Sequence, residues 1–311
     1  MANITAGMVK DLRDRTGAGM MDCKAALNET NGDMDAAMDW LRKKGITKAA
    51  KKAGRAAAEG LVGVAVGNGV GALVEVNAET DFVARNDEFK GFVNTAARLA
   101  LQEEGDLQKL LNARIGDASV QHTLTELVAK IGENMSVRRT IMLAVDPGVV
   151  AAYVHNATSP ELGKIGVLVA LKSSGDKAKL NALGRHIAMH VAAANPLALT
   201  PAHLDQAVVE KERAIQTDIA RQSGRPENVI EKMLEGRMRK FYEESVLVSQ
   251  VFLGPDSDGK LTVEKVIEKA SKDLGTPVAI EAFVRFQVGE GIEKVESDFA
   301  DEVAKMAGPK E

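Results

Sequence analysis

The segment LVGVAVGNGVGALVEV, residues 61–76, decides the fold of this chain, because its apolar residues alternate along the sequence on both sides of a short glycine-containing turn. The alternating residues are Val62, Val64 and Val66 before the turn and Val70, Ala72, Val74 and Val76 after it. Two such runs joined by a Gly-Asn-Gly turn are typical of a β-hairpin. The sequence therefore predicts a hairpin here.

A loop of mixed chemistry follows the hairpin. The stretch Thr80-Asp81-Phe82-Val83-Ala84-Arg85-Asn86 separates it from a helical pattern that begins near Asp87. Functional residues concentrate on loops between rigid elements, and no periodic pattern places Phe82 in the core. By pattern alone, however, a Phe at such a junction more often fills the core, and Asp81 more often caps a helix or turn. Both interpretations stay open at this point.

The order of strands and helices then repeats. A helix at about 119–133 and a strand-like run at 135–145 are followed by strand-like runs at 149–154 and 165–171 and by a helix that ends near residue 195. Two strands and a helix therefore occur twice. This order predicts a duplicated α+β module, with core subdomains at 55–146 and 147–291.

The N-terminal residues have a different pattern. Residues 4–45 contain three short helical patterns, with Thr5 and Asp33 as N-caps and Gly45 at the end of the third helix, and Trp40 is expected to pack on their common core. Residues 42–55 carry seven cations and no acid, which makes them a candidate linker. We expect a small three-helix domain with a basic linker at 1–54.

The C-terminal third is mostly helical. Two long helical patterns at 200–244 are separated by Ser-Gly-Arg-Pro, which predicts an antiparallel helical hairpin that projects from the core. A helix around 263–274, an alternating strand at 278–288 and a final amphipathic helix at 292–311 complete the chain. The expected fold class is thus α+β with a C-terminal helical module.

Composition limits the possible functions. A length of 311 residues predicts two or three domains, and 45% apolar with 27% charged residues is typical of a soluble globular protein. A net charge of −4 and only 4% aromatic residues disfavour a stacking platform for single-stranded nucleic acid. No apolar run is long enough for a membrane span and no signal peptide is visible, so a cytoplasmic location is expected. The single cysteine, Cys23, is interpreted as structural.

Motifs for covalent chemistry are missing from the sequence. No phosphate-binding loop is present, and the glycines at 67–71 lack the dinucleotide-binding spacing, so the chain is not expected to bind a nucleotide itself. His186 and His190 lie four residues apart, but no further ligand pattern completes a metal site. We therefore expect no metal, no cofactor and no enzymatic bond-making chemistry.

Several motifs in a fixed order resemble the bacterial translation elongation factor Ts family over essentially the whole chain. They are Arg15-Thr16-Gly17-Ala18-Gly19-Met20-Met21-Asp22-Cys23-Lys24, Thr80-Asp81-Phe82-Val83-Ala84, Lys130-Ile131-Gly132-Glu133-Asn134, Ile165-Gly166-Val167-Leu168-Val169-Ala170, His186-Ile187-Ala188-Met189-His190-Val191-Ala192-Ala193 and Val288-Gly289-Glu290-Gly291-Ile292-Glu293-Lys294. The segment from Gln250 to Pro255 departs from the family pattern, so the resemblance assigns no contacts there.

The resemblance implies a guanine nucleotide exchange factor that binds elongation factor Tu and promotes GDP release without covalent chemistry. It implies that Asp81 and Phe82, framed by Thr80 and Val83, disturb the partner's Mg²⁺ site. It also implies that residues 1–54 form a UBA-like domain that docks on the partner. The further partner-binding positions that it implies are Lys24, Ile165, Gly166 and His190.

Two alternatives stay open. An RNA- or ribosome-binding protein would use the basic run at 42–55, and an interaction scaffold would form a homodimer, or a 2:2 complex with its partner, through the helical hairpin. For the individual residues, pattern alone favours a solvated cation at Lys24, strand residues at Ile165 and Gly166, and a packed helix position at His190.

Overall fold

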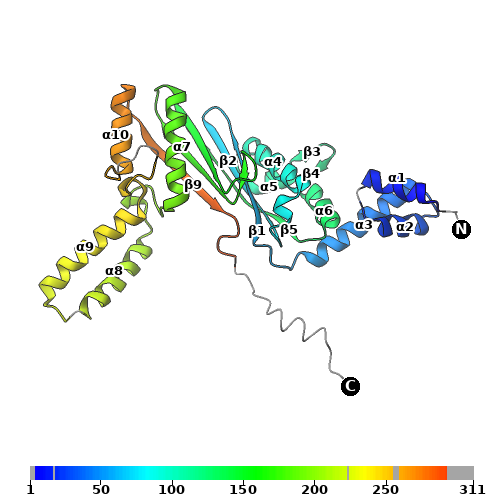
Figure 1. The fold of residues 1–311 in the computed structure, drawn as a ribbon, viewed down its shortest axis with the longest axis horizontal. Coiled ribbons are helices and arrows are strands. Elements are labelled where there is room, and N and C mark those ends of the chain that lie inside the picture. The colour runs from blue at the N-terminus through cyan, green and yellow to red at the C-terminus, as the bar shows by residue number, and fades with distance from the viewer. Residues whose placement is uncertain (1–3, 17, 223, 255–258, 293–311) are drawn as a thin grey trace, which may run out of the picture.

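The computed structural model describes residues 4–16, 18–222, 224–254 and 259–292. It contains both helices and sheets, as the α+β prediction requires, and three parts follow one another along its long axis (Figure 1). These parts are an N-terminal group of helices, a core of two sheets with helices on their outer sides, and a pair of long helices.

The N-terminal group consists of α1 (Ala6–Thr16), α2 (Met20–Glu29) and α3 (Met34–Lys52). The predicted caps are confirmed, because Thr5 Oγ1 accepts a hydrogen bond from the Met8 N–H and Asp33 accepts one from the Ala36 N–H. Leu12, Cys23 and Leu27 form the buried centre of this group, and Trp40 packs against it as predicted.

Helix α3 corrects one prediction. Gly45 does not end it, and the helix continues through most of the basic run to Lys52. The reason is tertiary: α3 packs against α6, and a Cβ on Gly45 would lie only 3.1 Å from the Ala129 Cβ, so the glycine permits a close approach of two helices. Ala49 packs against the core of the first sheet. The basic segment is therefore mainly a packed helix and not an extended linker.

The first sheet has the order β5-β2-β1-β7, and all its pairs are antiparallel. Its strands are β1 (Glu59–Val66), β2 (Val70–Ala78), β5 (Met135–Ala144) and the short β7 (Leu162–Gly163). The predicted hairpin is confirmed, with Leu61 paired to Val76 and Val66 to Gly71. Helices α4 (Asp87–Gln102), α5 (Leu107–Asn112) and α6 (Val120–Ile131) contribute the outer side of its core, and β3 (Arg114–Ile115) pairs with β4 (Ala118–Ser119) between α5 and α6.

The second sheet has the order β6-β8-β9. Its strands are β6 (Gly148–His155), β8 (Ile165–Lys172) and β9 (Ala279–Gln287), and α7 (Lys177–Ala194) covers its outer face. The inner faces of the two sheets pack on each other through Val62, Leu73, Val150, Leu168 and Phe286. The core therefore has four layers: helices, sheet, sheet and helix (Figure 1).

This layering explains why both faces of the hairpin are apolar. Val62 and Val64 face the second sheet, whereas Val74 and Val76 face the helices. The alternating residues of the two strands thus lie on opposite faces, and residues between them, such as Leu73, are buried as well.

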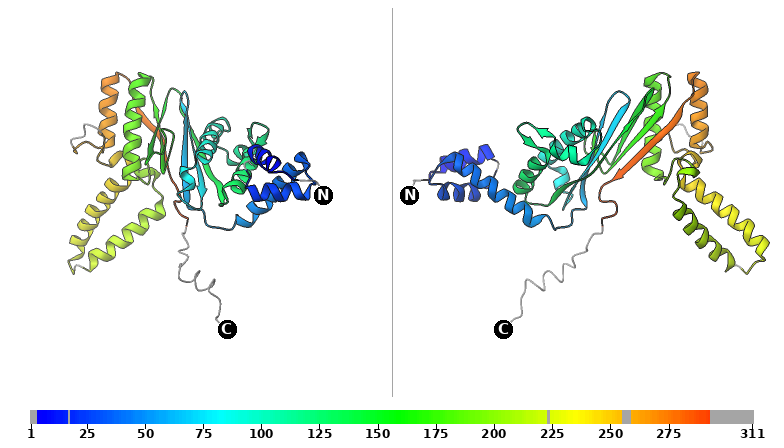
Figure 2. Two further views of the ribbon diagram at one scale, coloured as in Figure 1. Left: turned by 45° about the vertical axis from the view of Figure 1, so that its right-hand side comes forward. Right: turned by 180° about the vertical axis from the view of Figure 1, so that it is seen from behind.

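Helices α8 (Gln206–Arg221) and α9 (Glu227–Ser245) pack on each other and project from the second sheet, at the end of the molecule opposite the N-terminal helices (Figure 2). Their base is joined to the end of α7, since the Leu197 N–H donates to the Ser245 carbonyl and Ala198 pairs with Val246. Short 3₁₀ turns at Pro201–His203 and Leu247–Ser249 flank the pair, and α10 (Val263–Leu274) leads into β9. The predicted final helix lies outside the described residues after Ile292, and no described helix is both long and apolar enough to span a bilayer.

Candidate partner-binding site

Outside the N-terminal helices, Phe82 is the most exposed large apolar residue that the structure describes, with 74% of its surface accessible to solvent. It lies between β2 and α4, directly before a 3₁₀ turn at Val83–Arg85. The neighbouring Val83 is only 3% exposed and belongs to the core of the first sheet. The position that fills the core at this junction is therefore Val83, and Phe82 points its ring into solvent.

Asp81 does not cap a helix. Its carboxylate accepts a hydrogen bond from the Arg85 guanidinium, with Oδ2 and Nη2 3.1 Å apart, and 48% of its side chain stays exposed. The cap of α4 is Asn86, whose Oδ1 accepts from the N–H groups of Glu88 and Phe89 at 2.9 and 3.1 Å. Asp81 and Phe82 are thus adjacent, exposed and not required for the local structure of α4.

Glu133 fixes the start of this loop. Its two carboxylate oxygens accept hydrogen bonds from Thr80, one from the N–H at 3.0 Å and one from the hydroxyl at 2.8 Å. The next residue, Asn134, donates its N–H to the Glu79 carboxylate at 2.5 Å. The loop is therefore held from the segment between α6 and β5, which lies more than fifty residues away in sequence.

The same segment also contacts α3 and α4. The Asn134 side chain donates to the Arg55 carbonyl at 2.7 Å, and the Lys52 ammonium donates to the Gly132 carbonyl. Lys130 forms an ion pair with Glu88 at 2.6 Å. Residues 130–134, which we call the loop clamp, thus connect the end of α3, the exposed loop and the start of α4 through hydrogen bonds and an ion pair.

Sequence reasoning missed this role of the loop clamp. The motif Lys130-Ile131-Gly132-Glu133-Asn134 was a signal of family resemblance only, because hydrogen bonds over such a separation leave no periodic pattern in the sequence. Gly132 ends α6 with φ of +90°, a conformation that favours glycine, and this turn brings Glu133 and Asn134 to the loop.

Lys24 is exposed on α2, away from the loop of residues 79–86 in the N-terminal group. Met20 and Met21 on the same helix are also exposed, and a flexible apolar side chain beside a cation is suited to a protein contact. The basic run supplies fewer free cations than its sequence suggests, because Lys44 pairs with Asp22 and lies 4.5 Å from the centre of the Trp40 ring.

His190 is fully buried on α7. Its Nε2–H donates to the Gln250 side-chain oxygen at 2.8 Å, and its Nδ1 accepts from the Leu253 N–H at 3.1 Å, so both hydrogen bonds suit a neutral ring. Burial lowers the pKa of His190 below its ordinary value, although the hydrogen bond to Gln250 opposes the shift. His190 therefore supports residues 250–253, where the exposed side chains of Val251 and Leu253 lie.

Ile165 and Gly166 begin β8, the middle strand of the second sheet. Ile165 is half-buried, and a Cβ on Gly166 would lie 2.6 Å from Val62 of the first sheet, so the glycine permits the two sheets to approach. The structure thus brings Thr80, Asp81, Phe82 and Val83 together, but it places Lys24, His190 and the start of β8 at separate positions. Within the described residues no group of three potential metal-ligating side chains is present.

Comparisons with known proteins agree over almost the entire chain. A family model described as Elongation factor TS matches residues 79–290. A protein named Elongation factor Ts from Parvibaculum lavamentivorans is 59% identical over 310 residues, which cover 99% of both chains. Proteins of the same name from Rhodospirillum rubrum and Maricaulis maris are 58% and 56% identical, over 98% and 99% of each chain respectively.

Proposed function

The chain belongs to the elongation factor Ts family, and from this premise we propose that it is the guanine nucleotide exchange factor of an elongation factor Tu. The observation that carries the proposal is the exposed Phe82 beside the half-exposed Asp81, on a loop that is hydrogen-bonded to the loop clamp. The chain acts on a partner protein and makes or breaks no covalent bond.

Phe82 acts as a wedge. A solvent-exposed aromatic side chain gains free energy when it enters an apolar site on a partner, and a rigid loop loses little conformational entropy in doing so. If the ring enters only after helices of the partner have shifted, it stabilises the shifted state. In that state the partner's contacts to Mg²⁺ and to the phosphates of GDP are weakened, and GDP leaves faster.

Asp81 acts together with Phe82. Its carboxylate is half-exposed and held by Arg85 in a fixed position next to the ring. Mg²⁺ prefers oxygen ligands in a near-ideal octahedral geometry, so a negative charge introduced close to the partner's ion disturbs its coordination. Thr80 and Val83 frame the pair: Thr80 binds the loop clamp, and Val83 fills the core beneath the ring.

The remaining positions act by docking and support. Lys24, with its exposed methionine neighbours, contacts the nucleotide-binding domain of the partner from the N-terminal helices. His190, Ile165 and Gly166 are largely enclosed, so they act by shaping the surface of the second sheet and the segment 250–253. This surface contacts a part of the partner away from its nucleotide.

Domain roles follow the same logic. Residues 1–54 form the docking unit, and residues 55–146 and 147–291 form two related core subdomains. The helical hairpin at 200–244 offers a surface for a second copy of the chain or for a 2:2 complex. The protein works in the cytoplasm, where translation takes place.

Linkage constrains the mechanism. An exchange factor that lowers the affinity of its partner for GDP must lose affinity for the partner by the same factor when GDP binds. The nucleotide-free partner is therefore the form that binds this chain most tightly. Binding of GTP or GDP to the partner releases the chain from the complex.

A stopped-flow measurement tests the proposal. Fluorescent GDP is released from elongation factor Tu into excess unlabelled nucleotide, with and without the chain at one tenth of the partner concentration. We expect the whole population of partner to release GDP faster, because one molecule of chain serves many partners. An unchanged release rate with a folded sample would refute the proposed function.

A further inference from the structure

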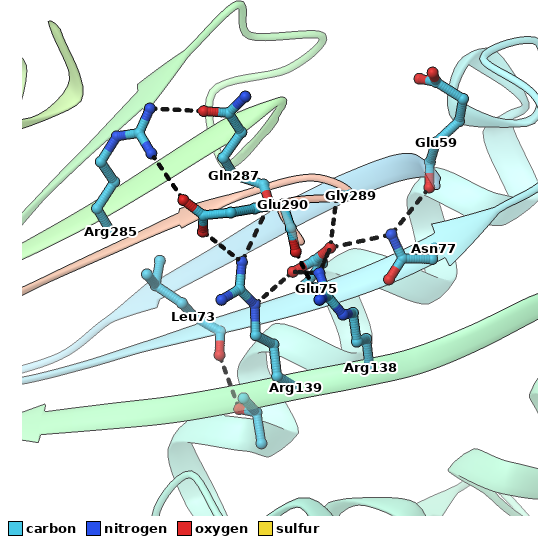
Figure 3. Close-up of polar contacts among 11 residues, drawn as sticks. Glu59, Leu73, Glu75, Asn77, Arg138, Arg139, Arg285, Gln287, Gly289 and Glu290 are labelled. Carbon is cyan, nitrogen blue, oxygen red and sulfur yellow. Dashed lines mark hydrogen bonds and ion pairs between the residues drawn. The ribbon is translucent and has the colours of Figure 1, made fainter. Parts of the chain in front are cut away.

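Glu75 is a fully buried carboxylate in β2, at the centre of a polar cluster between the two sheets (Figure 3). Its oxygens accept hydrogen bonds from Arg139 Nε at 2.5 Å, Arg138 Nη1 at 3.1 Å, the Gly289 N–H at 2.8 Å and Asn77 Nδ2 at 3.0 Å. A buried carboxylate is costly unless its acceptor sites are filled, and here they are filled by donors from three segments of the chain.

Both arginines reach the same carboxylate because of a β-bulge. Glu75 pairs with Arg139 and Val76 pairs with Val137, so Arg138 is an extra residue in β5. Neighbouring residues of a regular strand point to opposite faces, whereas a bulge places two of them on one side and bends the strand. Figure 3 shows Arg138 and Arg139 converging on Glu75.

The bulge lies close to the candidate site. Three residue pairs separate it from the end of the β2–β5 ladder, where Ala78 pairs with Met135. Beyond this last pair, β2 leads into the loop of Thr80 to Phe82, and the loop clamp, which contains Glu133, directly precedes β5. Three pairs span about 10 Å, so the bend that the bulge imposes sets the direction in which both the loop and its clamp leave the sheet.

The cluster also holds the chain beyond β9. Arg139 donates to the Gln287 carbonyl at 3.1 Å and pairs with the Glu290 carboxylate at 3.2 Å, and Arg138 donates to the Glu290 carbonyl at 2.7 Å. Gly289 has φ of +73°, and a Cβ there would lie 2.1 Å from the Ala58 carbonyl oxygen, so only glycine fits where its N–H meets Glu75. The end of the second sheet is thus fastened to the bulge of the first.

Stability alone does not explain a buried charge at this position. A buried ion pair often contributes no more stability than well-packed apolar side chains, so its value lies in the one geometry that it permits. Burial alone would raise the pKa of Glu75, but the hydrogen bonds from Gly289, Arg139 and Asn77 and the charge of Arg139 hold that pKa below its ordinary value. The group is therefore a carboxylate at neutral pH, with a fixed set of partners.

We infer that Glu75 is a positioning residue for nucleotide exchange: with Arg138 and Arg139 it fixes the bulge that aims the Phe82 loop at the partner. The inference rests on the proposed function. Glu75 itself touches no partner, since its side chain is fully enclosed. Its effect reaches the partner through the last three pairs of the ladder and through the loop clamp.

The test compares Glu75→Gln with a control of similar stability. Glutamine keeps the shape of the side chain and removes its charge. The control is Leu180→Ala, because Leu180 is a fully buried residue of α7 in the core of the second sheet. Each variant is measured at a temperature that lies the same number of degrees below its own Tm. GDP release is measured against chain concentration, and hydrogen exchange is followed in peptides covering 79–86, 131–137 and 177–194.

A misaimed loop lowers the maximal rate of GDP release while docking by the N-terminal helices continues. We expect Glu75→Gln to lower kcat at least fivefold with KM within about twofold, and to speed hydrogen exchange at 79–86 and 131–137 but not at 177–194. Leu180→Ala should keep its kcat and lose protection in 177–194. If Glu75→Gln does not fold, Arg138→Met, which leaves Glu75 paired with Arg139, should give the same pattern.

The inference is overturned if Glu75→Gln exchanges like the unmodified chain, or if both variants lose exchange and protection in proportion to their lower Tm. Failure of the unmodified chain to speed GDP release would instead defeat the proposed function. In that case the hydrogen-exchange comparison still decides whether Glu75 holds the loop.

Discussion

Truncation of Phe82 to alanine should affect exchange and stability very differently. About a quarter of the Phe82 side chain is buried in the free chain, because 74% is exposed. Full burial of a Phe side chain is worth about 1.5 to 3 kcal/mol, so Phe82→Ala should lower the free energy of unfolding by only about 0.5 kcal/mol and Tm by about 1 to 2 °C. If Phe82 is the proposed wedge, the other three quarters become buried when the ring enters the partner, which corresponds to about 1 to 2 kcal/mol.

The loss of this binding free energy in Phe82→Ala corresponds to about a five- to thirtyfold lower kcat/KM for GDP release, and to a larger loss if the ring is a central anchor. The assay is stopped-flow release of fluorescent GDP, with thermal unfolding measured on the same samples. Val66→Ala is the matched control, since Val66 is an exposed apolar residue at the opposite end of the same hairpin and should leave both quantities unchanged. A Phe82→Ala chain that exchanges normally but has a much lower Tm would refute the reasoning, because it would make Phe82 a core residue.

Four further changes have distinct expected outcomes. Glu133→Ala, which leaves the two Thr80 donors without their acceptor, should lower exchange about as much as Phe82→Ala, with faster hydrogen exchange in the loop as its signature. Lys24→Glu should raise KM at least threefold without changing kcat or Tm, as expected of an exposed docking residue, and an unchanged KM would remove it from the docking surface. Glu75→Gln should lower Tm at neutral pH. Because the pKa of Glu75 lies below 4.5 in the folded chain, the difference in Tm between this variant and the unmodified chain should be constant above about pH 5. It should shrink as the pH falls through that lowered pKa. His190 is held neutral with a lowered pKa, so its protonation favours the unfolded chain: thermal unfolding should show stability falling as pH drops below about 6.5, and His190→Gln should reduce that slope.

Local patterns predicted much of the fold. The hairpin at 61–76 and the helix after Asn86 follow from spacings of two and of three to four residues, which depend only on neighbours in sequence. The end of α3 was predicted wrongly for the opposite reason. Gly45 reads as a stop signal, but its lack of a side chain serves the contact with Ala129 on another helix.

The candidate site could be predicted only in part. The exposure of Phe82 was suggested by the absence of a periodic reason for burial, whereas the burial of Val83 beside it depends on the core beneath the turn. Glu75 lies between two apolar residues of a strand, where an alternating pattern predicts a solvent-facing side chain. It is buried because the second sheet covers that face, and no local pattern contains this information.

A contact measurement from position 82 shows directly whether Phe82 enters the partner. A photoreactive phenylalanine analogue, p-benzoylphenylalanine, replaces Phe82, and the chain is irradiated with elongation factor Tu in the absence of nucleotide and with excess GDP and Mg²⁺. We predict a cross-link to the nucleotide-binding domain of the partner that excess GDP and Mg²⁺ suppress, and none from the same analogue at Val66. A complex that forms normally but gives no cross-link from position 82, or one that GDP and Mg²⁺ leave unchanged, would contradict the account.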